Sequence, residues 1–485
     1  MKVRYLPHAD RQALHKLRHM TDTDEMAVLF EEVLHREFSI QALWEYRKWF
    51  NMLTPEDIKK HPVVAIGCAQ VLILDGKIDK AREVISMLPL GSYYQSLIKM
   101  YVPGLSKEDM FSLIRDIKGK GPTPVPNMTL TAARPSVLNG VWDFTPYADR
   151  MIENKDSAME LIEVLFGEQA GYIYELAYAE SMYWRDDCYG ALVKIVGIIP
   201  FLKERDDMRL LFAALTLEIY IMVLNGQAAV VAPLMENLRK QIKETELNEY
   251  LPNIEAMTAW GAMYDGDYET VTKWMRDGAP DENGKFCMLD LFRYMVKMRA
   301  YIIQGKHLAV TALAMRLLPL VEGGERYMDT CELHIIWAMS DYADGRKEEA
   351  VSHLEVALKL SEKYHYDRLF ADEGQRVLEL LRYYKKIGKC GVNEEYFEHV
   401  LKLTEKTAGM HPRYLKVQLS ETPALTNTEM KVLRLLAELY TNGQIAEITG
   451  TAEETVKKHC KHIFAKLSVK NRHQAVQRAR ELGII

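Results

Sequence analysis

The chain has 485 residues, of which 48% are apolar and 27% are charged, and its 62 basic and 68 acidic side chains give a formal charge of −6. This charge excludes a chain that coats nucleic acid or an anionic membrane along its whole length, but it does not exclude local basic patches. The cysteines show no C-x-x-C spacing, which favours neither a disulfide framework nor a structural zinc site. The N-terminus has no apolar signal-peptide core, and the longest apolar stretch, residues 63–74, is too short to span a bilayer. We therefore expect a cytoplasmic protein with no membrane contact.

Between about residues 45 and 385 the apolar residues recur at helical spacing, which predicts an all-α body. Gly226, Gly266, Gly305 and Gly345 add a period, because they are 40, 39 and 40 residues apart. A small or β-branched residue stands five positions after each glycine. This pattern is typical of a helix–turn–helix unit whose turn takes the left-handed conformation. Because one unit cannot bury its apolar face alone, we expect a stacked superhelical solenoid similar to tetratricopeptide (TPR) repeats.

The same register recurs earlier in the chain. Ala81 stands five residues after Gly76, and Ala191 stands five residues after Asp186, which is itself 40 residues before Gly226. Many aromatic residues also fall on the predicted repeat helices. We interpret them as repeat core rather than as a ligand site, because aromatic residues at helical spacing usually pack inside.

One stretch interrupts the array. Residues 119–147 hold five of the seventeen prolines, which block helix continuation and predict a long irregular loop. Loops of this length in compact domains are usually functional or disordered. Two interpretations stay open: the loop packs along the inner face of the solenoid, or it is a surface linker.

The charge is distributed unevenly along the chain. Residues 1–424 hold 52 basic and 62 acidic side chains, whereas residues 425–485 hold 10 basic and 6 acidic ones. Within that tail, residues 456–480 contain eight Lys or Arg residues and no acid. Such a run is a candidate footprint for a polyanion, and a solvated helix face is the alternative.

The tail carries the start and stop signals of several short helices. Thr426 followed by Glu429 predicts a capping box on a first helix, and Thr441 or Asn442 is expected to cap a second. A turn at residues 449–451 separates the second helix from a third, predicted over about residues 453–467.

The spacing of Ala446, Gly450 and Val456 fits a helix-turn-helix, with a small residue at the helix crossing, a glycine in the turn and an aliphatic residue seating the second helix. The third helix of the tail would then turn a basic face outward. A long basic helix of this kind can enter a major groove.

The string LT..E..VL.LLA, IAE..G, TVK.H...I..KL.VK.R.QAV resembles the LuxR-type helix-turn-helix family over nearly all of residues 425–485. The resemblance implies double-stranded DNA as the partner and a homodimer on DNA. The residues that it implies as base or groove contacts are Lys457, Lys458, Lys461 and His462. Those that it implies as phosphate contacts are Thr455, Lys466 and Arg472. Those that it implies on a pairing helix are Ala475, Val476, Ala479 and Leu482.

The tail departs from the family pattern at a few positions. Ala452 replaces the usual Ser or Thr cap of the recognition helix, and Leu439-Tyr440 replaces a Gly-Leu pair. His459, Cys460 and His462 superficially look like a metal cluster, but we expect Cys460 to point into the core and no further ligand pair accompanies them. We therefore expect neither a metal nor another cofactor.

Over the body, residues 49–88 and the stretch RPSVLNGVWDF at residues 134–144 resemble the C-terminal half of the large regulators related to MalT, the activator of maltose genes. That resemblance implies a superhelical repeat sensor that binds an inducer. None of the Gly-Lys pairs is followed by the Ser or Thr of a Walker A motif, so we do not expect ATP-driven assembly. No G-x-S-x-G, H-E-x-x-H or G-x-G-x-x-G motif occurs, so we do not expect an enzyme.

We therefore predict a transcription regulator with three parts: a TPR-like sensor or interaction domain over residues 1–406, a linker over residues 407–424 and a four-helix LuxR-type domain over residues 425–485. A small-molecule or protein effector would bind the repeat and control DNA binding or dimerisation of the tail. The rival hypothesis is a protein-interaction scaffold in which DNA binding is secondary.

Overall fold

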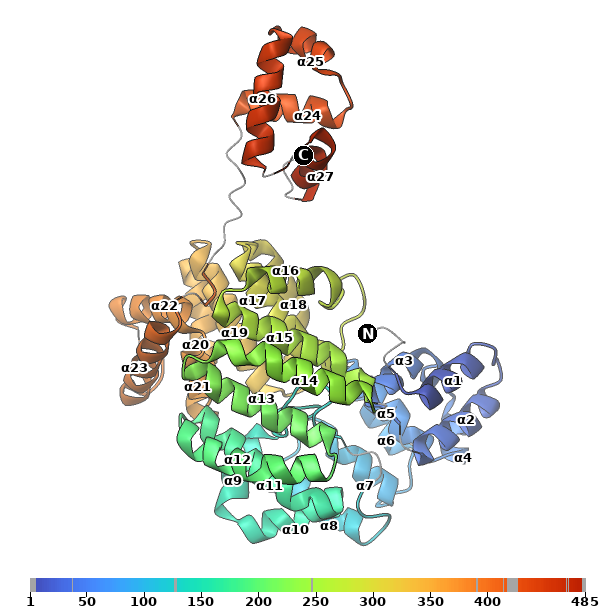
Figure 1. The fold of residues 1–485 in the computed structure, drawn as a ribbon. Coiled ribbons are helices and arrows are strands. Elements are labelled where there is room, and N and C mark those ends of the chain that lie inside the picture. The colour runs from blue at the N-terminus through green and yellow to red at the C-terminus, as the bar shows by residue number, and fades with distance from the viewer. Residues whose placement is uncertain are drawn as a thin grey trace. The chain divides into compact units, whose positions relative to one another are not determined.

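The computed structural model describes residues 6–36, 38–125, 129–245, 247–389, 391–412, 414–416, 426–467, 469 and 471–481. Its regular elements are helices, and these residues contain no strand beyond one isolated bridge between Asn139 and Asp143 (Figure 1). The predicted all-α class is therefore confirmed. No helix among the described residues is long and apolar enough to cross a membrane.

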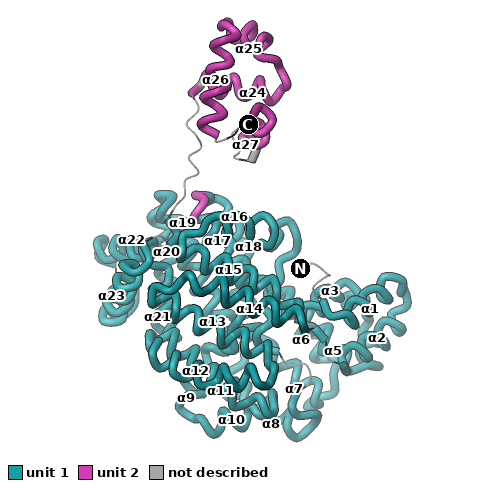
Figure 2. Tube along the Cα trace, viewed as in Figure 1, with its two compact units in different colours: residues 1–302, 306–416 teal, residues 303–305, 417–485 magenta. Residues whose placement is uncertain are grey.

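The chain divides into two compact units, residues 1–302 with 306–416 and residues 417–485 with 303–305 (Figure 2). We call the described residues up to 416 the body and those from 426 onward the small domain. The body helices are α1 (His8–Leu17), α2 (Thr23–His35), α3 (Ile40–Phe50), α4 (Pro55–Lys60), α5 (Val64–Leu74), α6 (Ile78–Ser86), α7 (Tyr93–Met100), α8 (Lys107–Lys118), α9 (Ala148–Glu153), α10 (Lys155–Phe166), α11 (Ala170–Trp184), α12 (Cys188–Glu204), α13 (Met208–Leu224), α14 (Val231–Lys243), α15 (Leu251–Asp265), α16 (Tyr268–Asp277), α17 (Leu291–Ile303), α18 (His307–Gly323), α19 (Tyr327–Ala343), α20 (Lys347–Tyr364), α21 (Asp367–Ala371), α22 (Gly374–Lys386) and α23 (Glu394–Met410). The small-domain helices are α24 (Asn427–Ala437), α25 (Asn442–Thr449), α26 (Glu453–Lys466) and α27 (Arg472–Glu481).

The turns of the body follow the predicted period. Gly226, Gly266, Gly305 and Gly345 have φ of 79°, 78°, 66° and 84°, and Asp186 one period earlier has φ of 68°. The residues five positions later pack in the interior, each with at most 2% of its surface exposed: Ala191, Val231, Val271, Val310 and Ala350. Close packing of the second helix on the first is the reason for this small-residue position, as α11 on α12 and α19 on α20 illustrate.

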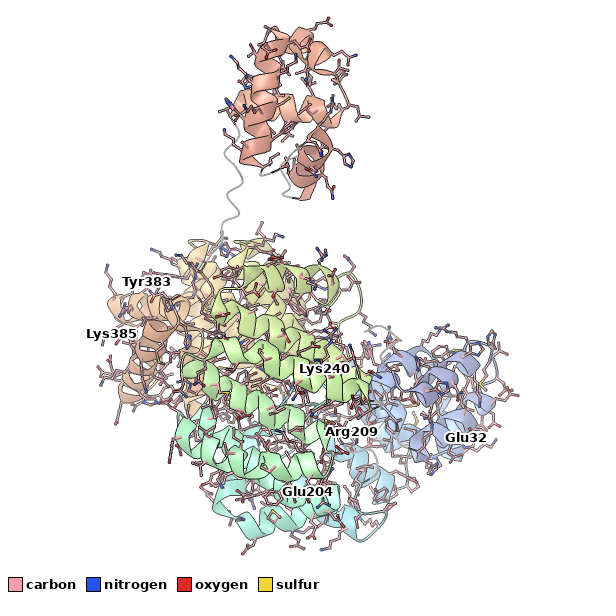
Figure 3. All side chains as sticks on the ribbon, viewed as in Figure 1. Glu32, Glu204, Arg209, Lys240, Tyr383 and Lys385 are labelled. Atoms are coloured by element: carbon pink, nitrogen blue, oxygen red, sulfur yellow. The ribbon has the colours of Figure 1, made fainter. Side chains whose placement is uncertain are left out.

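Side chains fill the interior of the body, whereas charged residues such as Glu204, Lys240 and Lys385 lie on its outer surface (Figure 3).

The Pro-rich loop enters the body. Most of residues 130–145, which we call the inner segment, are buried. The carbonyl oxygen of Ala132 accepts hydrogen bonds from Gln41 on α3 and Asn253 on α15, both at 3.0 Å. Thr131 donates to the carbonyl oxygen of Arg209 on α13 at 3.1 Å. Of the two interpretations that the sequence left open, the inner segment follows the first, because it packs inside the body and is not a surface linker.

The inner segment is also tied to α11 and α19. Glu180 of α11 accepts hydrogen bonds from the backbone of Val137 and Leu138, at 2.8 and 3.2 Å.

The chain returns sharply at Gly140, where a Cβ atom would lie 1.8 Å from the carbonyl oxygen of Leu130. Only glycine fits this crossing, because the atoms that a Cβ would meet are backbone atoms of Leu130 and Ser136.

The body extends beyond the predicted start of the linker. Helix α23 continues to Met410, and Tyr414 and Leu415 are buried, with the Tyr414 ring stacked on that of Tyr264 at a centroid distance of 3.8 Å. Residues 407–412 and 414–416 therefore belong to the body rather than to a linker. Residues 417–425 lie outside the described residues.

Candidate nucleic-acid interface

The small domain has its own apolar core, built by all four of its helices. Most of its side chains come from α24 and α26, which pack against each other. The core residues are Val432, Leu433, Leu436, Ile445, Ala446, Val456, Cys460, Ile463, Leu467, Ala475 and Ala479. This core fixes the orientation of α26 about its own axis and so decides which of its residues face solvent.

Local caps set the ends of these helices. The Thr426 hydroxyl accepts a hydrogen bond from the Glu429 backbone, and the Glu429 carboxylate accepts one from the Thr426 backbone. Thr441 and Gln444 form a second box of the same kind on α25. Gly450 ends α25 with a φ of 67°. The first box confirms the predicted capping box, and the second shows that Thr441 rather than Asn442 caps α25; its partner Gln444 was not predicted.

Helix α26 begins at Glu453 with Ala452 as its N-cap, and no side chain caps it. Val456, Cys460 and Ile463 point into the core with 0%, 7% and 0% of their surface exposed. The opposite side of the helix is open to solvent because the buried residues recur every three or four positions. The exposed residues on that side that were predicted as base or groove contacts are Lys457, Lys458, Lys461 and His462.

These cations are not equally available. The ammonium group of Lys457 lies 3.4 Å from Glu454 and 3.5 Å from Glu453, and the hydrogen bond with Glu454, followed by the charges of both carboxylates, raises the pKa of Lys457. In the part of the small domain that the structure describes, Lys458 and Lys461 form no ion pair. Exposed pairs such as those of Lys457 contribute little free energy, so an incoming phosphate can replace them.

The three predicted phosphate contacts differ in their surroundings. Thr455 is exposed on the first turn of α26. The ammonium group of Lys466 lies 2.7 Å from the buried carboxylate of Glu429, and Arg472 donates to the carbonyl oxygen of Leu436 at 2.8 Å. Lys466 and Arg472 therefore join helices within the domain, a role that the sequence did not predict.

Glu429 connects two of these features. Burial raises its pKa, but the hydrogen bonds from Lys466 and Thr426 outweigh that effect and leave the pKa lowered. Its carboxylate thus caps α24 and anchors the end of α26 at the same time.

The predicted pairing residues on α27 face different surroundings. Ala475 and Ala479 have no exposed surface and belong to the domain core, and Val476 packs against it. In this arrangement the two alanines cannot contact a second domain, because their side chains are already enclosed. Leu482 lies outside the described residues. Pairing through α27 stays a prediction, and it would use the outward side of the helix, which carries His473 and Gln474.

The cysteine beside the two histidines lies in the core. Burial raises the pKa of the Cys460 thiol, and the group is packed among aliphatic side chains. Among the residues that the structure describes, no three or more His, Cys, Asp or Glu side chains form a group suited to a metal ion.

The body holds a buried cluster of charges that the sequence did not predict. Arg134 of the inner segment pairs with Asp329 at 2.7 Å and with Glu332 at 2.5 Å, both on α19. Arg299 of α17 lies 2.8 Å from the other oxygen of Glu332 and donates to Glu373 at 2.9 Å. We call these five residues the buried ion network.

The buried ion network reaches the end of the body. The hydroxyl of Tyr414, three residues before the undescribed stretch 417–425, donates to Glu373 at 3.1 Å. Burial would raise the pKa of Glu332, but Arg134 and Arg299 outweigh it and lower that pKa. No local pattern could have revealed the network, because Arg134 lies 195 and 198 residues from its two partners on α19.

Comparisons with known proteins agree with both units. The luxR family of bacterial regulatory proteins matches residues 423–479, and the MalT-like TPR region matches residues 201–386. The HTH-type transcriptional regulator MalT of Serratia proteamaculans is 22% identical over 466 residues, covering 85% of this chain and 48% of that protein.

Two further relatives bear the same name. MalT of Vibrio cholerae is 27% identical over 168 residues, covering 32% of this chain and 19% of that protein. MalT of Klebsiella pneumoniae is 30% identical over 155 residues, covering 29% of this chain and 17% of that protein. The chain thus spans less than half the length of each of these relatives. The small domain is thus similar to the luxR family of bacterial regulatory proteins, and the body contains a region similar to the MalT-like TPR region.

Proposed function

We propose that the chain regulates transcription by inserting α26 into the major groove of double-stranded DNA, and that an effector bound to the body controls this binding or the pairing of two small domains. The observation that carries the proposal is the exposed basic face of α26, with Lys458 and Lys461 opposite the core-facing residues of the same helix. A lysine on such a helix can donate to the O6 and N7 atoms of guanine and to phosphates.

The control step needs a difference in affinity between two arrangements of the chain. An effector changes DNA binding only if it binds more tightly to the arrangement that releases the small domain, or to the one that withholds it. The opposite charges of residues 1–424 and 425–485 support electrostatic masking of the basic face by the acidic body. Screening limits such attraction between exposed charges to about 8–10 Å at physiological salt.

DNA binding is tested by selecting sites from random duplex DNA with the full chain and then measuring affinity for selected and unselected duplexes. Lys461→Ala is expected to weaken binding to the selected site by about 5- to 150-fold, with a smaller effect on unselected DNA. Lys431→Ala is the matched control, because Lys431 is exposed on α24 and carries the same charge. Equal losses for the two variants on both duplexes would contradict base reading by Lys461.

A second substitution separates base reading from backbone contact. Lys466→Ala is expected to weaken selected and unselected DNA alike and to flatten the salt dependence by about one unit. Because Lys466 also holds Glu429, the melting of the domain must be followed alongside the affinity. A selective loss at the chosen site would assign Lys466 to base reading instead.

Masking is tested by comparing the full chain with residues 420–485, which have their own apolar core. Tighter DNA binding by the fragment at the same salt is expected. Equal affinity would exclude masking by the body.

One observation favours the second candidate function, a protein-interaction scaffold. Helix α12 exposes Tyr189, Val193 and Phe201 with 78%, 57% and 53% of their surface open, an apolar face of the kind that marks contact surfaces. Light scattering against concentration is the test, and Val193→Asp is expected to abolish self-association. A chain that stays monomeric at about 100 μM would count against this surface.

A further inference from the structure

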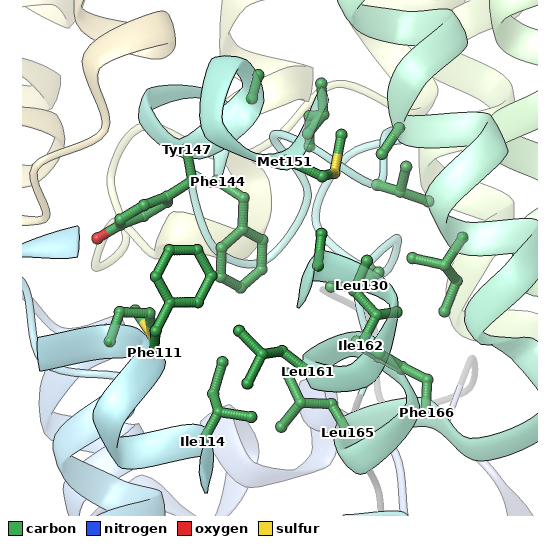
Figure 4. Close-up of a pocket in the computed structure, with 17 residues that line it drawn as sticks. Phe111, Ile114, Leu130, Phe144, Tyr147, Met151, Leu161, Ile162, Leu165 and Phe166 are labelled. Carbon is green, nitrogen blue, oxygen red and sulfur yellow. The ribbon is translucent and has the colours of Figure 1, made fainter. Parts of the chain in front are cut away.

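The body contains an apolar cavity of about 110 Å³ between α8, α9, α10, α11 and the inner segment. In Figure 4, Phe111 and Ile114 of α8 lie beside Leu161 and Leu165 of α10, with Phe144 and Tyr147 above Phe111. Voids larger than a water molecule are few in close-packed protein interiors, so a space of this size stands out from the packing around it.

The chemistry of the wall decides what the cavity can hold. Of the described residues that line it, only Tyr147 carries a hydroxyl, and that oxygen points away from the other lining side chains (Figure 4). A sugar, a phosphate or an amino acid would lose its hydrogen bonds with water and find no partner here. The wall therefore accepts an uncharged apolar molecule, and 110 Å³ suits one aromatic ring or a short alkyl chain.

The cavity has a route to solvent. Phe111, Met151 and Ile162 line it and are only half buried, so a small molecule can reach it past their side chains.

One wall of the cavity belongs to the inner segment. Leu130, Val137 and Leu138 line the cavity, and Arg134 between them is anchored in the buried ion network. That network ends at Tyr414, beside the undescribed stretch that leads to the small domain. A molecule in the cavity would thus contact the inner segment, which contributes Arg134 to the buried ion network.

We propose that this cavity binds a small uncharged apolar molecule, an aromatic hydrocarbon or a short alkyl chain, and that this molecule is the effector of the regulator. The assignment of a binding site stands on the cavity alone, and only the effector role rests on the proposed function.

Binding is tested on the full chain with toluene as the probe, followed by saturation-transfer NMR. A ligand of seven heavy atoms is expected to bind with a Kd of about 1 mM or below. Benzylamine is the control ligand, because it has a similar shape and carries a charge that the wall cannot accept. Thermal unfolding should show a rise in Tm of about 2 °C when toluene is present at tenfold its Kd.

Two variants fill the cavity from two different helices. Ala158→Leu on α10 is expected to reduce toluene binding at least tenfold, and Ala177→Leu on α11 gives the same test if the first variant does not fold. Ala312→Leu is the matched control, because Ala312 is exposed on α18. The site would be overturned by any of three results. The unmutated chain does not bind toluene, both filling variants still bind it, or benzylamine binds as tightly as toluene.

The effector role has a separate readout. The affinity of the full chain for its selected DNA is expected to change at least about fivefold when toluene saturates the cavity. Toluene bound in the cavity with unchanged DNA affinity would overturn the effector role. A chain that binds no DNA under any condition would overturn the proposed function, while the NMR result on the cavity would stand.

Discussion

The body and the small domain place their charges in opposite ways. In the body, Arg134, Arg299 and Glu332 are buried and join segments that are far apart in the sequence. In the small domain the core is apolar, and Lys458 and Lys461 face solvent. A large unit buries a greater fraction of its surface and can surround an ion pair with partners, whereas a domain of about 60 residues has little such interior. Charge thus organises the body internally, whereas the small domain leaves Lys458 and Lys461 available for a ligand and pairs its buried Glu429 with Lys466.

The largest effect that tests this comparison is expected from the buried ion network. Arg134→Met should lower the free energy of unfolding of the body by about 3–5 kcal/mol, because it leaves buried carboxylates with fewer cations. Urea unfolding followed by tryptophan fluorescence measures the body alone, since all seven tryptophans precede residue 425. Arg382→Met, which removes an exposed pair with Glu405, should cost at most about 1 kcal/mol. Similar losses for both variants would contradict the special role of the network.

The two units should also respond to pH in opposite directions, beginning with Glu180 in the body. Burial raises the pKa of Glu180 to about 7, despite the hydrogen bonds that it accepts from the inner segment. The folded body therefore keeps a proton that the unfolded chain releases near pH 4.5, so this stabilisation is complete below pH 4.5 and is lost as the pH rises through about 7. The free energy of unfolding should fall by about 1–3 kcal/mol between pH 5 and 8. Glu180→Gln should flatten the profile, and an unchanged slope in that variant would show that another group causes it.

Glu429 gives the small domain the reverse dependence. Because its pKa is lowered in the folded domain, its contribution is present above the unfolded value near 4.5 and is lost as the pH falls. Circular dichroism of residues 420–485 during acid titration measures this effect. The stability of the Glu429→Gln fragment should fall less on acidification than the stability of the unmutated fragment.

A smaller effect is expected where the small domain departs from the luxR-type pattern that it resembles. Leu439 has a φ of 70° and is 82% exposed, so its side chain is strained by the backbone and gains little from packing. Leu439→Gly should raise the free energy of unfolding of residues 420–485 by about 0.5–1 kcal/mol, measured by urea unfolding. Ile448→Gly is the control, because Ile448 is exposed within α25 and should destabilise the domain. A loss of stability in both variants would mean that the left-handed turn is not strained.

The smallest effect concerns the start of α26. Ala452→Ser should add the missing N-cap and raise the stability of residues 420–485 by about 0.5 kcal/mol. The DNA affinity should change little, because the substitution leaves the charge of the basic face unaltered. Thermal unfolding of the fragment gives the first value and DNA titration the second; a destabilised Ser variant would argue that residue 452 already has its preferred side chain.

Features that depend on neighbouring residues could be predicted from the sequence. The left-handed turns at Gly226 and Asp186 follow from a period and a local pattern, and the capping box of Thr426 and Glu429 needs only three residues. The side of α26 that faces solvent follows from helical spacing alone, because buried positions recur every three or four residues. Helical class, repeat register and the candidate basic face therefore follow from local sequence, without any tertiary contact.

Only the tertiary structure decided which of these groups are already engaged. The position of the inner segment depends on contacts from α3 to α19, and Lys466 and Glu429 meet across 37 residues. The family resemblance implies that Ala475 lies on a pairing helix, whereas in the folded domain its side chain packs in the core. The same is true of the cavity, whose wall joins α8 and α10 to a loop without regular structure. The sequence shows which side chains are able to pair. Which distant partners do pair depends on the packing of the whole unit, because a buried polar group without a partner is energetically costly.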